Sequence, residues 1–284
     1  MKSFGAFPEN YELIDAGGGR KLERWGTIIT IRPEHQAYFA AVRSKKEWQD
    51  LAHWEFLPKS EGSLQGTWKK LKPDAPDEWI FTTHSDAAFT LRITNNKHVG
   101  LFPEQHINWE FISESLDASK RFLNAFAYTG AASVFGRKSG AEVIHCDSVK
   151  PMLDWGRQNQ LNSGLDGIKW VHEDALKFIR REVKRGNTYD LVQLDPPAWG
   201  LGAKGEKWKL EDLLGTLIFE AFQLLNKSGV LIINTYSPKV DIATINQLIR
   251  ETGIRASKTE NSELWLKASS GKELYYGILT RIYK

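Results

Sequence analysis

Short apolar runs alternate with longer amphipathic stretches between residues 121 and 253. The apolar runs predict buried strands, which read RFLNAFA, EVIHCD, IKWVHED, YDLVQLD and GVLIINTY. The stretches between them predict helices, and several end at a glycine that suits a left-handed C-cap, namely Gly140, Gly186, Gly229 and Gly253. Strands that alternate with helices are typical of parallel βαβ units. The pattern therefore predicts an α/β fold with a mostly parallel sheet.

Two further strand patterns follow near the C-terminus, SELWLKA and LYYGILTRIY. A short segment that contains Ser269, Ser270 and Gly271 separates them. Two strands joined by so short a turn pair antiparallel. We therefore expect the parallel sheet to end in an antiparallel C-terminal hairpin.

The first part of the chain has short strand patterns without alternating helices. These strands read YELIDA, KLERWG, TIITIRP, GTWKKLK, DEWIFTTH, AFTLRIT and HVGLF. Asn95 and Asn96 suit a turn between the last two, and residues 37–54 are expected to be helical in part. We expect residues 1–112 to form a β-rich accessory or substrate domain and residues 113–284 to form the α/β domain.

Ligands of open α/β sheets bind outside the carboxyl ends of the strands. The first of these ends reads N-A-F-A-Y-T-G, where Gly130 permits a tight turn and a close approach of the backbone to a ligand. The dinucleotide fingerprint G-x-G-x-x-G is absent, because Phe126 and Tyr128 stand where glycines are expected. Without that backbone cradle for a pyrophosphate, NAD and FAD are not expected.

Carboxylates follow the second and third strands. Asp147 ends the second strand, where an ionised carboxylate can accept hydrogen bonds from both hydroxyls of a ribose. The third strand ends in Glu173, Asp174 and Ala175, where a carboxylate can accept from an adenine amino group. The alternative for both Asp147 and Asp174 is structural, because each can cap the helix that follows it.

The fourth strand ends in the most specific pattern of the chain, Asp195-Pro196-Pro197-Ala198-Trp199-Gly200. Two prolines directly after a strand neither continue a sheet ladder nor readily enter a helix, so they form a rigid, extended turn. We expect their carbonyls to point into the site without competing donors. A rigid array of acceptors suits a substrate N–H or a cationic methyl-sulfonium group. The alternative is a pair of prolines that simply terminates the strand.

At these residues the sequence resembles the class I methyltransferases and, more narrowly, the bacterial family of 23S ribosomal RNA large-subunit base methyltransferases. The resemblance extends from Phe89 to Tyr236 and includes TLRITNNKHVGLFPEQ, FAYTG, CDSVKPMLDWGRQNQLN and LDPPAWG. It implies a Rossmann-like sheet, S-adenosylmethionine as cofactor with S-adenosylhomocysteine as product, and an RNA base as substrate. The residues that it implies as cofactor contacts are Gln105, Phe126, Tyr128, Thr129, Gly130, Asp147, Ser148, Asp174, Ala175 and Asp195.

Two features depart from the family. Ala198 and Trp199 stand where the family often has a basic residue after the prolines. Residues 1–88 do not resemble the RNA-binding PUA domain that some members carry. Both features concern the RNA substrate and leave the cofactor expectation unchanged.

The residues predict attack by a nitrogen. Methylation of cytosine at carbon 5 usually needs a cysteine nucleophile, and the only cysteine, Cys146, lies inside the second strand and is expected to be a buried structural residue. Asp-Pro-Pro followed by an aromatic residue resembles the motif of amino-methylating enzymes. In these enzymes a carboxylate and a proline carbonyl hold the amine, and an aromatic ring stacks on the base. The residues expected to act in catalysis are Asp195, Pro196, Pro197 and Trp199, with Trp199 stacking on an extruded base.

The composition indicates the cellular environment in which the protein is expected to act. Hydrophobic residues at 41% and charged residues at 26% are ordinary for a soluble globular protein. No apolar run approaches the ~20 residues that span a bilayer, and the N-terminal residues lack the apolar core of a secretion signal. One cysteine excludes an intramolecular disulfide, and no Cys/His pairing has zinc spacing. A cytoplasmic protein without a metal or a membrane partner is expected.

The formal net charge of +3 permits an RNA partner without demanding one. Basic residues recur along one predicted helix, where they form either a solvated face or an RNA contact: Lys177, Arg180, Arg181, Lys184 and Arg185. Lys204, Lys207 and Lys209 follow Trp199 and are better placed to meet phosphate. Two alternatives remain open beside the RNA methyltransferase, namely a methyltransferase of a small molecule or protein and a non-catalytic S-adenosylmethionine-binding module. The oligomeric state is open as well.

Overall fold

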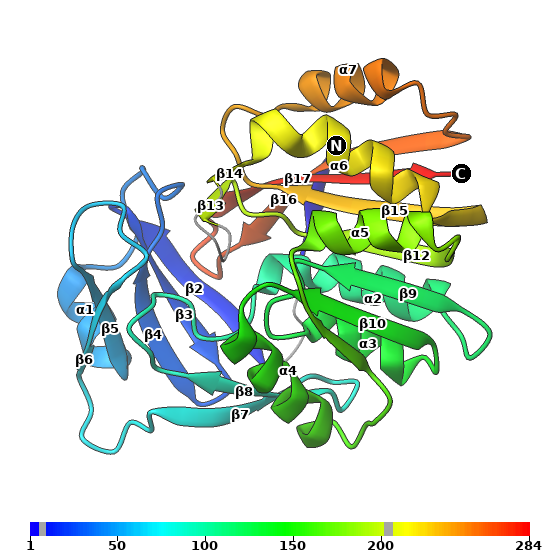
Figure 1. Ribbon diagram of the computed structural model, residues 1–284. Helices are drawn as coiled ribbons and strands as arrows, with labels where there is room; N and C mark the ends of the chain where they lie inside the picture. Colours follow the sequence, from blue (N-terminus) through cyan, green and yellow to red (C-terminus); the bar gives the residue numbers. More distant parts are fainter. Residues whose placement is uncertain (6–9, 202–206) are drawn as a thin grey trace. The chain divides into compact units, whose positions relative to one another are not determined.

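The computed structural model describes residues 1–5, 10–201 and 207–284, and they form two compact units. The first unit comprises Met1–Ser3, Asn108–Leu264 and Gly277–Lys284. The second unit comprises Phe4–Ile107 and Trp265–Tyr276. Figure 1 shows the helices and strands of both units. None of the helices in the described ranges is long and apolar enough to cross a membrane.

The first unit is built on an eight-stranded sheet. In spatial order its strands are β1 (Lys2–Phe4), β16 (Lys258–Lys267), β17 (Glu273–Tyr283), β15 (Leu225–Thr235), β12 (Tyr189–Leu194), β9 (Arg121–Ala125), β10 (Glu142–Asp147) and β11 (Lys169–His172). The strands from β15 to β11 run parallel, and β17 pairs antiparallel with β15. The predicted Rossmann-like sheet with an antiparallel C-terminal end is therefore confirmed.

Helices cover both faces of this sheet. They are α2 (His106–Ser115), α3 (Ala131–Lys138), α4 (Lys150–Asn162), α5 (Ala175–Lys184), α6 (Leu210–Gln223) and α7 (Ile242–Thr252). Apolar residues of α5, α6 and α7 share one core with Leu123 and Cys146 of the sheet. On the opposite face Gly136 of α3 lies against Phe122, since a Cβ at Gly136 would come within 2.6 Å of that ring. Side chains therefore alternate between the two faces along each strand, as period 2 requires.

The predicted glycine C-caps are confirmed at three of the four positions. Gly140, Gly186 and Gly253 have φ values of 91°, 71° and 69°, in the left-handed region. The expectation for Gly229 was wrong, because this residue lies inside β15. Helix α6 instead ends with Leu224 as its C-cap in a right-handed conformation, and the chain enters the strand directly.

The second unit is rich in strands, as the sequence predicts. A five-stranded sheet has the order β2 (Tyr11–Gly17), β3 (Arg20–Trp25), β4 (Ile28–Pro33), β5 (Trp54–Pro58) and β6 (Gly66–Lys70). A separate hairpin pairs β7 (Glu78–Thr82) with β8 (Ala88–Arg92). The short helix α1 (Lys45–Leu51) connects β4 to β5, which pair in parallel, so residues 37–54 are helical in part as expected.

Two details of this unit differ from the sequence interpretation. The run HVGLF does not form a strand, although Arg92 donates one backbone hydrogen bond to Val99. Asn95 and Lys97 make their backbone hydrogen bonds with the segment at Gly66 instead, so they do not close a hairpin. Residues 54–58 form a strand that the sequence pattern did not indicate.

The tip of the C-terminal hairpin belongs to the second unit. Ser269 and Ser270 donate backbone hydrogen bonds to Leu13 and Ile14 of β2. The hydroxyl of Tyr276 accepts a 2.9 Å hydrogen bond from Lys21. The second unit thus contains residues from near both ends of the chain. The expected boundary between two domains after residue 112 stays a prediction.

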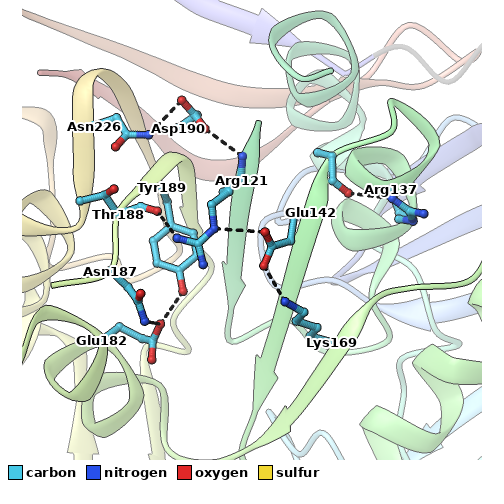
Figure 2. A network of polar contacts seen from close by, with 11 residues as sticks. Arg121, Arg137, Glu142, Lys169, Glu182, Asn187, Thr188, Tyr189, Asp190 and Asn226 are labelled. Carbon is cyan, nitrogen blue, oxygen red and sulfur yellow. Dashed lines mark hydrogen bonds and ion pairs between the residues drawn. The ribbon is translucent and has the colours of Figure 1, made fainter. Parts of the chain in front are cut away.

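A network of polar contacts joins the amino ends of the parallel strands, as Figure 2 shows. Glu142 at the start of β10 pairs with Arg121 of β9 at 3.3 Å and with Lys169 of β11 at 2.6 Å. Asp190 of β12 accepts from the backbone N–H of Arg121 at 2.8 Å and from the amide of Asn226 at 3.0 Å. The network therefore ties five neighbouring strands together at one edge of the sheet.

Candidate active site

The order of the strands reverses at β9. The chain runs outward through β9, β10 and β11 and then returns to place β12 on the other side of β9. In open α/β sheets this reversal leaves a crevice at the carboxyl ends of the two strands, where ligands bind. Here those ends carry the FAYTG segment after β9 and the Asp195-Pro196-Pro197 turn after β12. The backbone N–H of Asp195 lies 3.4 Å from the carbonyl oxygen of Ala125, so the two turns begin side by side.

Residues 126–130, which we call the cofactor turn, adopt a left-handed backbone at three positions. The φ values are 57° at Phe126, 50° at Tyr128 and 83° at Gly130. A left-handed conformation costs a non-glycine residue of the order of 1–3 kcal/mol and persists only where the surroundings hold it. Such outliers cluster at ligand-binding sites.

Neighbouring elements hold the cofactor turn by its backbone. The N–H of Tyr128 donates to the carboxylate of Asp147 at 2.8 Å. The side-chain amide of Asn159, buried in α4, donates to the carbonyl of Thr129 at 2.9 Å. These contacts come from neighbouring elements of the protein, so they hold the shape of the turn without a ligand.

His145 lies beneath the cofactor turn and was not singled out from the sequence. Its ring is fully buried, and its Nδ1 lies 3.0 Å from the hydroxyl of Ser133. Burial lowers the pKa of this imidazole to about 3, so it stays neutral at physiological pH. A Cβ at Gly130 would come within 3.3 Å of the ring, so this position needs glycine for space as well as for φ.

Asp147 is buried and its carboxylate accepts backbone hydrogen bonds from Tyr128 and Val149, both at 2.8 Å. Burial raises its pKa, and the two N–H donors partly oppose that shift. Helix α4 has Val149 as its N-cap and no side-chain cap, so Asp147 does not have the capping role that was its alternative. The carboxylate therefore joins the cofactor turn to the segment that leads into α4.

Asp174 has the structural role that was its alternative. It is the N-cap of α5, and its side chain accepts from the N–H of Lys177 at 2.9 Å. The cap uses one carboxylate oxygen, and the other oxygen can still accept a hydrogen bond. A contact between Asp174 and adenine therefore stays a prediction. Ala175 is the buried first residue of the same helix.

Asp195 is the most perturbed carboxyl of the candidate site. Its surroundings raise its pKa to about 7, chiefly through burial, while a hydrogen bond from the Tyr236 side chain lowers it. Tyr236 follows β15, the strand beside β12, and was not recognised as a site residue in the sequence. Gly277 has φ 125° and passes so close to Thr235 that a Cβ would lie 2.3 Å from its carbonyl oxygen. This glycine allows β17 to pack against the segment that carries Tyr236.

The proline carbonyls are not equally available, contrary to the sequence expectation. The indole N–H of Trp208 donates to the carbonyl of Pro197 at 2.6 Å, so this carbonyl has a competing donor. The ring of Trp208 also lies 5.1 Å from that of Phe126 in a tilted arrangement. Trp208 therefore joins the proline turn to the cofactor turn, a role that no sequence signal indicated.

The remaining expected residues lie as follows. Ser148 is exposed, and its carbonyl lies 3.0 Å from the Nε2 of His172. Gln105 is buried in the 3-10 helix Pro103–Gln105 of the second unit, so its contact with the cofactor stays a prediction. Trp199 is exposed on the short strand β13 (Trp199–Leu201), which pairs with β14 (Lys207–Lys209). Lys204 lies outside the described residues.

Cys146 and the basic helix match their structural interpretations. Cys146 is buried in the core under α5, on the face of β10 opposite to His145, and burial raises the pKa of its thiol. Three arginines of the basic segment form ion pairs: Arg180 of α5 with Glu220, Arg181 of α5 with Glu173, and the C-cap residue Arg185 with Glu182. No group of three or more His, Cys, Asp or Glu side chains that could hold a metal ion occurs in the described part of the chain.

Comparison with known proteins places this site in context. Residues 62–256 match the family model described as S-adenosylmethionine-dependent methyltransferase. A solved S-adenosylmethionine-dependent methyltransferase from Agrobacterium tumefaciens is 33% identical, with a TM-score of 0.90 over 100% of this chain and 92% of that one. A methyltransferase solved in complex with SAH has a TM-score of 0.77 at 17% identity, covers 98% of this chain and 76% of that one, and shows the shared fold.

The names of the curated relatives are those of ribosomal RNA methyltransferases. The chain is 28% identical to ribosomal RNA large subunit methyltransferase I of Aeromonas salmonicida, over 87% of this chain and 60% of that protein. It is 30% identical to ribosomal RNA large subunit methyltransferase K/L of Shewanella frigidimarina, over 59% of this chain and 24% of that protein. The chain thus spans 60% or less of the length of these two relatives.

Proposed function

Because the chain belongs to the S-adenosylmethionine-dependent methyltransferase family, we propose that it transfers a methyl group to a nitrogen of a base in ribosomal RNA. The predicted family and the predicted cofactor, S-adenosylmethionine, are both confirmed by these matches. The base, the nitrogen and the RNA itself belong to the proposal. With a ribosomal RNA substrate, we expect the reaction to take place in the cytoplasm.

The residues at the carboxyl ends of β9 and β10 fit this cofactor. Gly130 keeps open a space that a Cβ would fill against His145, and the cofactor turn is held in shape by Asp147 and Asn159. In this proposal Tyr128, Thr129 and Gly130 line the cofactor, and Asp147 accepts from its ribose hydroxyls. When bound, S-adenosylmethionine supplies an electrophilic methyl group on a sulfonium.

The observation that carries the proposal is the position of the Asp195-Pro196-Pro197 turn, which begins beside the cofactor turn at the carboxyl ends of β12 and β9. The raised pKa of Asp195 supports it. Asp195 and the carbonyl of Pro196 accept the two N–H bonds of an exocyclic amine, which orients the nitrogen lone pair toward the methyl group. Pro197 is left to anchor Trp208. Above pH 7 the ionised Asp195 can also take the proton that the nitrogen must lose.

The names of the curated relatives favour RNA, and the mild net charge of +3 favours the alternative of a small-molecule or protein substrate. Transfer of a radiolabelled methyl group to total RNA from a strain that lacks this protein separates the two. The matched variants are Asp195→Ala in the turn and Asp190→Asn at the other end of the same strand.

We expect label in RNA with the wild-type protein and with Asp190→Asn, and none with Asp195→Ala. Nuclease mapping then locates the base. If RNA stays unlabelled while S-adenosylhomocysteine binds normally, the RNA proposal fails. Small molecules and protein extracts are then the substrates to test.

A further inference from the structure

The hairpin formed by β13 and β14 has two faces with different partners. Trp199 is paired with Lys209, and Gly200 is paired with Trp208. Because side chains alternate along a strand, Trp199 and Lys209 point to one face, and Trp208 points to the other. A Cβ at Gly200 would lie 3.8 Å from Pro197 and 3.8 Å from the Cβ of Trp208, so these three residues share the inner face.

The inner face is anchored to the candidate active site. Trp208 is half-buried, donates to the carbonyl of Pro197 and packs against Phe126 of the cofactor turn. The hairpin is therefore fixed to the two turns that are proposed to hold the amine and the cofactor. A group bound on its other face keeps a defined position relative to the reacting nitrogen.

The outer face exposes an aromatic ring beside two cations. The side chain of Trp199 is 63% exposed, and every other tryptophan in the described ranges is buried or half-buried. Lys207 and Lys209 are exposed and alternate with Trp208 along β14, so they share the face of Trp199. Lys209 has one ion pair, with Asp212 at 3.2 Å, and both partners are exposed, so a phosphate can compete for it.

We propose that this outer face binds the nucleotide next to the target base in a single-stranded segment of RNA. The inference rests on the proposed function, since it takes the target base to be held by Asp195 and Pro196 on the inner side. The neighbouring base stacks on Trp199, and its phosphate contacts Lys207 and Lys209. In this proposal the base on Trp199 is the neighbour and not the extruded target base expected from the sequence, because Trp199 points away from the face that carries Pro197.

The chemistry of the face favours nucleic acid over protein. Every base has a π-face, and stacking on an exposed aromatic ring is worth about 1–3 kcal/mol per base. Lysines beside the ring add attraction for the backbone that weakens as salt rises. A single-stranded segment is required, because a base within a duplex already stacks on its neighbours.

Binding is tested with the full chain and a fluorescein-labelled single-stranded 12-nucleotide RNA of mixed sequence, with its duplex as comparison. Trp199→Ala should weaken single-strand binding by about tenfold and leave duplex binding unchanged. The double variant Lys207→Gln, Lys209→Gln should reduce the slope of log affinity against log salt by about one to two. Phe219→Ala is the matched control, since this ring is 43% exposed on α6 and should change neither quantity.

A second experiment separates the neighbouring nucleotide from the target. Once the methylated base is mapped, an RNA with an abasic sugar beside it is compared with the intact RNA on wild-type protein and Trp199→Ala. The two losses of affinity should not add, because both remove the same stacked pair.

Additive losses, or unchanged binding by Trp199→Ala with normal S-adenosylhomocysteine affinity, would overturn the inference. Either result would leave the proposed function standing, since neither concerns methyl transfer to the target base. Failure of the wild-type protein to label any RNA counts against the proposed function itself.

Discussion

In the first unit, the pKa values of carboxyl groups shift in opposite directions at the two ends of the parallel strands. At the amino ends, hydrogen bonds and ion pairs from Lys169 and Arg121 lower the pKa of Glu142. Burial would raise the pKa of Asp190, but donors from Arg121, Asn226 and Lys120 outweigh it and lower the pKa. At the carboxyl ends, burial prevails and raises the pKa of both Asp147 and Asp195.

Asp190 and Asp195 make the contrast within a single strand, β12 and the residue after it. Donors from Arg121 and Asn226 outweigh burial at Asp190, whereas at Asp195 burial outweighs the hydrogen bond from Tyr236. Strongly shifted pKa values cluster at functional sites, because catalytic groups need pKa values matched to their task. The carboxylates at the amino ends of the strands thus stabilise the fold, while those at the carboxyl ends have the raised pKa values that suit a catalytic site.

The largest effect is expected at Asp195. Asp195→Asn should lower methyl transfer by about 10²–10⁴-fold, because the acceptor for the amine and its proton is lost. The same variant should unfold at a higher temperature at pH 8. The raised pKa means that ionised Asp195 costs stability, a cost that grows as pH rises from the unfolded pKa near 4 to about 7 and then stays constant.

Calorimetry at pH 8 and at pH 4 tests this trade-off. The gain in stability should be about 1–2 kcal/mol at pH 8, after allowance for solvent screening, and should shrink toward pH 4. A variant that loses both activity and stability at pH 8 would contradict the contrast between the two ends.

A second effect is expected at Gly130. Gly130→Ala places a Cβ against His145 at a φ of 83°, a strain of about 1–3 kcal/mol, so affinity for S-adenosylhomocysteine should fall by about tenfold or more. The control is Gly186→Ala, where φ is 71° and no atom lies within 4 Å of the added Cβ. Isothermal titration should show normal affinity for the control, and equal losses in both variants would rule out a specific role for the cofactor turn.

A third, smaller effect concerns Tyr236. The rate of wild-type methyl transfer should rise with pH and level off above about 7, where Asp195 is ionised. Tyr236→Phe removes a hydrogen bond that lowers the pKa of Asp195, so the profile should shift to higher pH. We expect a loss of about three- to tenfold at pH 7 that recovers at pH 9. A loss of the same size at every pH would show that Tyr236 acts only through packing.

The smallest effect is expected at the opposite end of β12. Asp190→Asn should cost about 1–2 kcal/mol at pH 7, since the hydrogen bonds lose their charged acceptor, while the activity of the folded protein stays normal. Its pKa is lowered in the folded state, so the contribution of Asp190 is present above the unfolded pKa near 4 and is lost as pH falls through the folded value. Urea unfolding of both proteins should converge in acid.

Much of the first unit was predictable from local pattern. The central parallel strands were recognised from apolar runs, because a strand buried on both faces carries few polar residues. The edge strand β11 was recognised as well, although none of its residues is buried. The helix end expected at Gly229 was wrong, because glycine also occurs in strands. In the second unit HVGLF was taken for a strand, since its composition fits one, yet its neighbours at Asn95 and Lys97 pair with another segment.

In the candidate site, too, some residues were found from the sequence and others were missed. The stretches FAYTG and DPPAW and the acidic residue Asp147 were found from their places at strand ends, and all three lie at the carboxyl edge of the sheet. His145, Asn159, Tyr236 and Trp208 were missed, because nothing in their local sequence distinguishes them from core or surface residues. Their roles arise from contacts with segments distant in the chain.

The sequence by itself determined which segments form strands and helices, and which residues stand where parallel strands end. These properties depend on periodicity and on turn-forming residues, and both are local. Only the tertiary structure decided which proline carbonyl accepts from Trp208, which face of the hairpin Trp199 occupies, and which carboxylates have raised pKa values. Hydrogen-bond partners and burial come from packing between distant segments, and no local pattern encodes them.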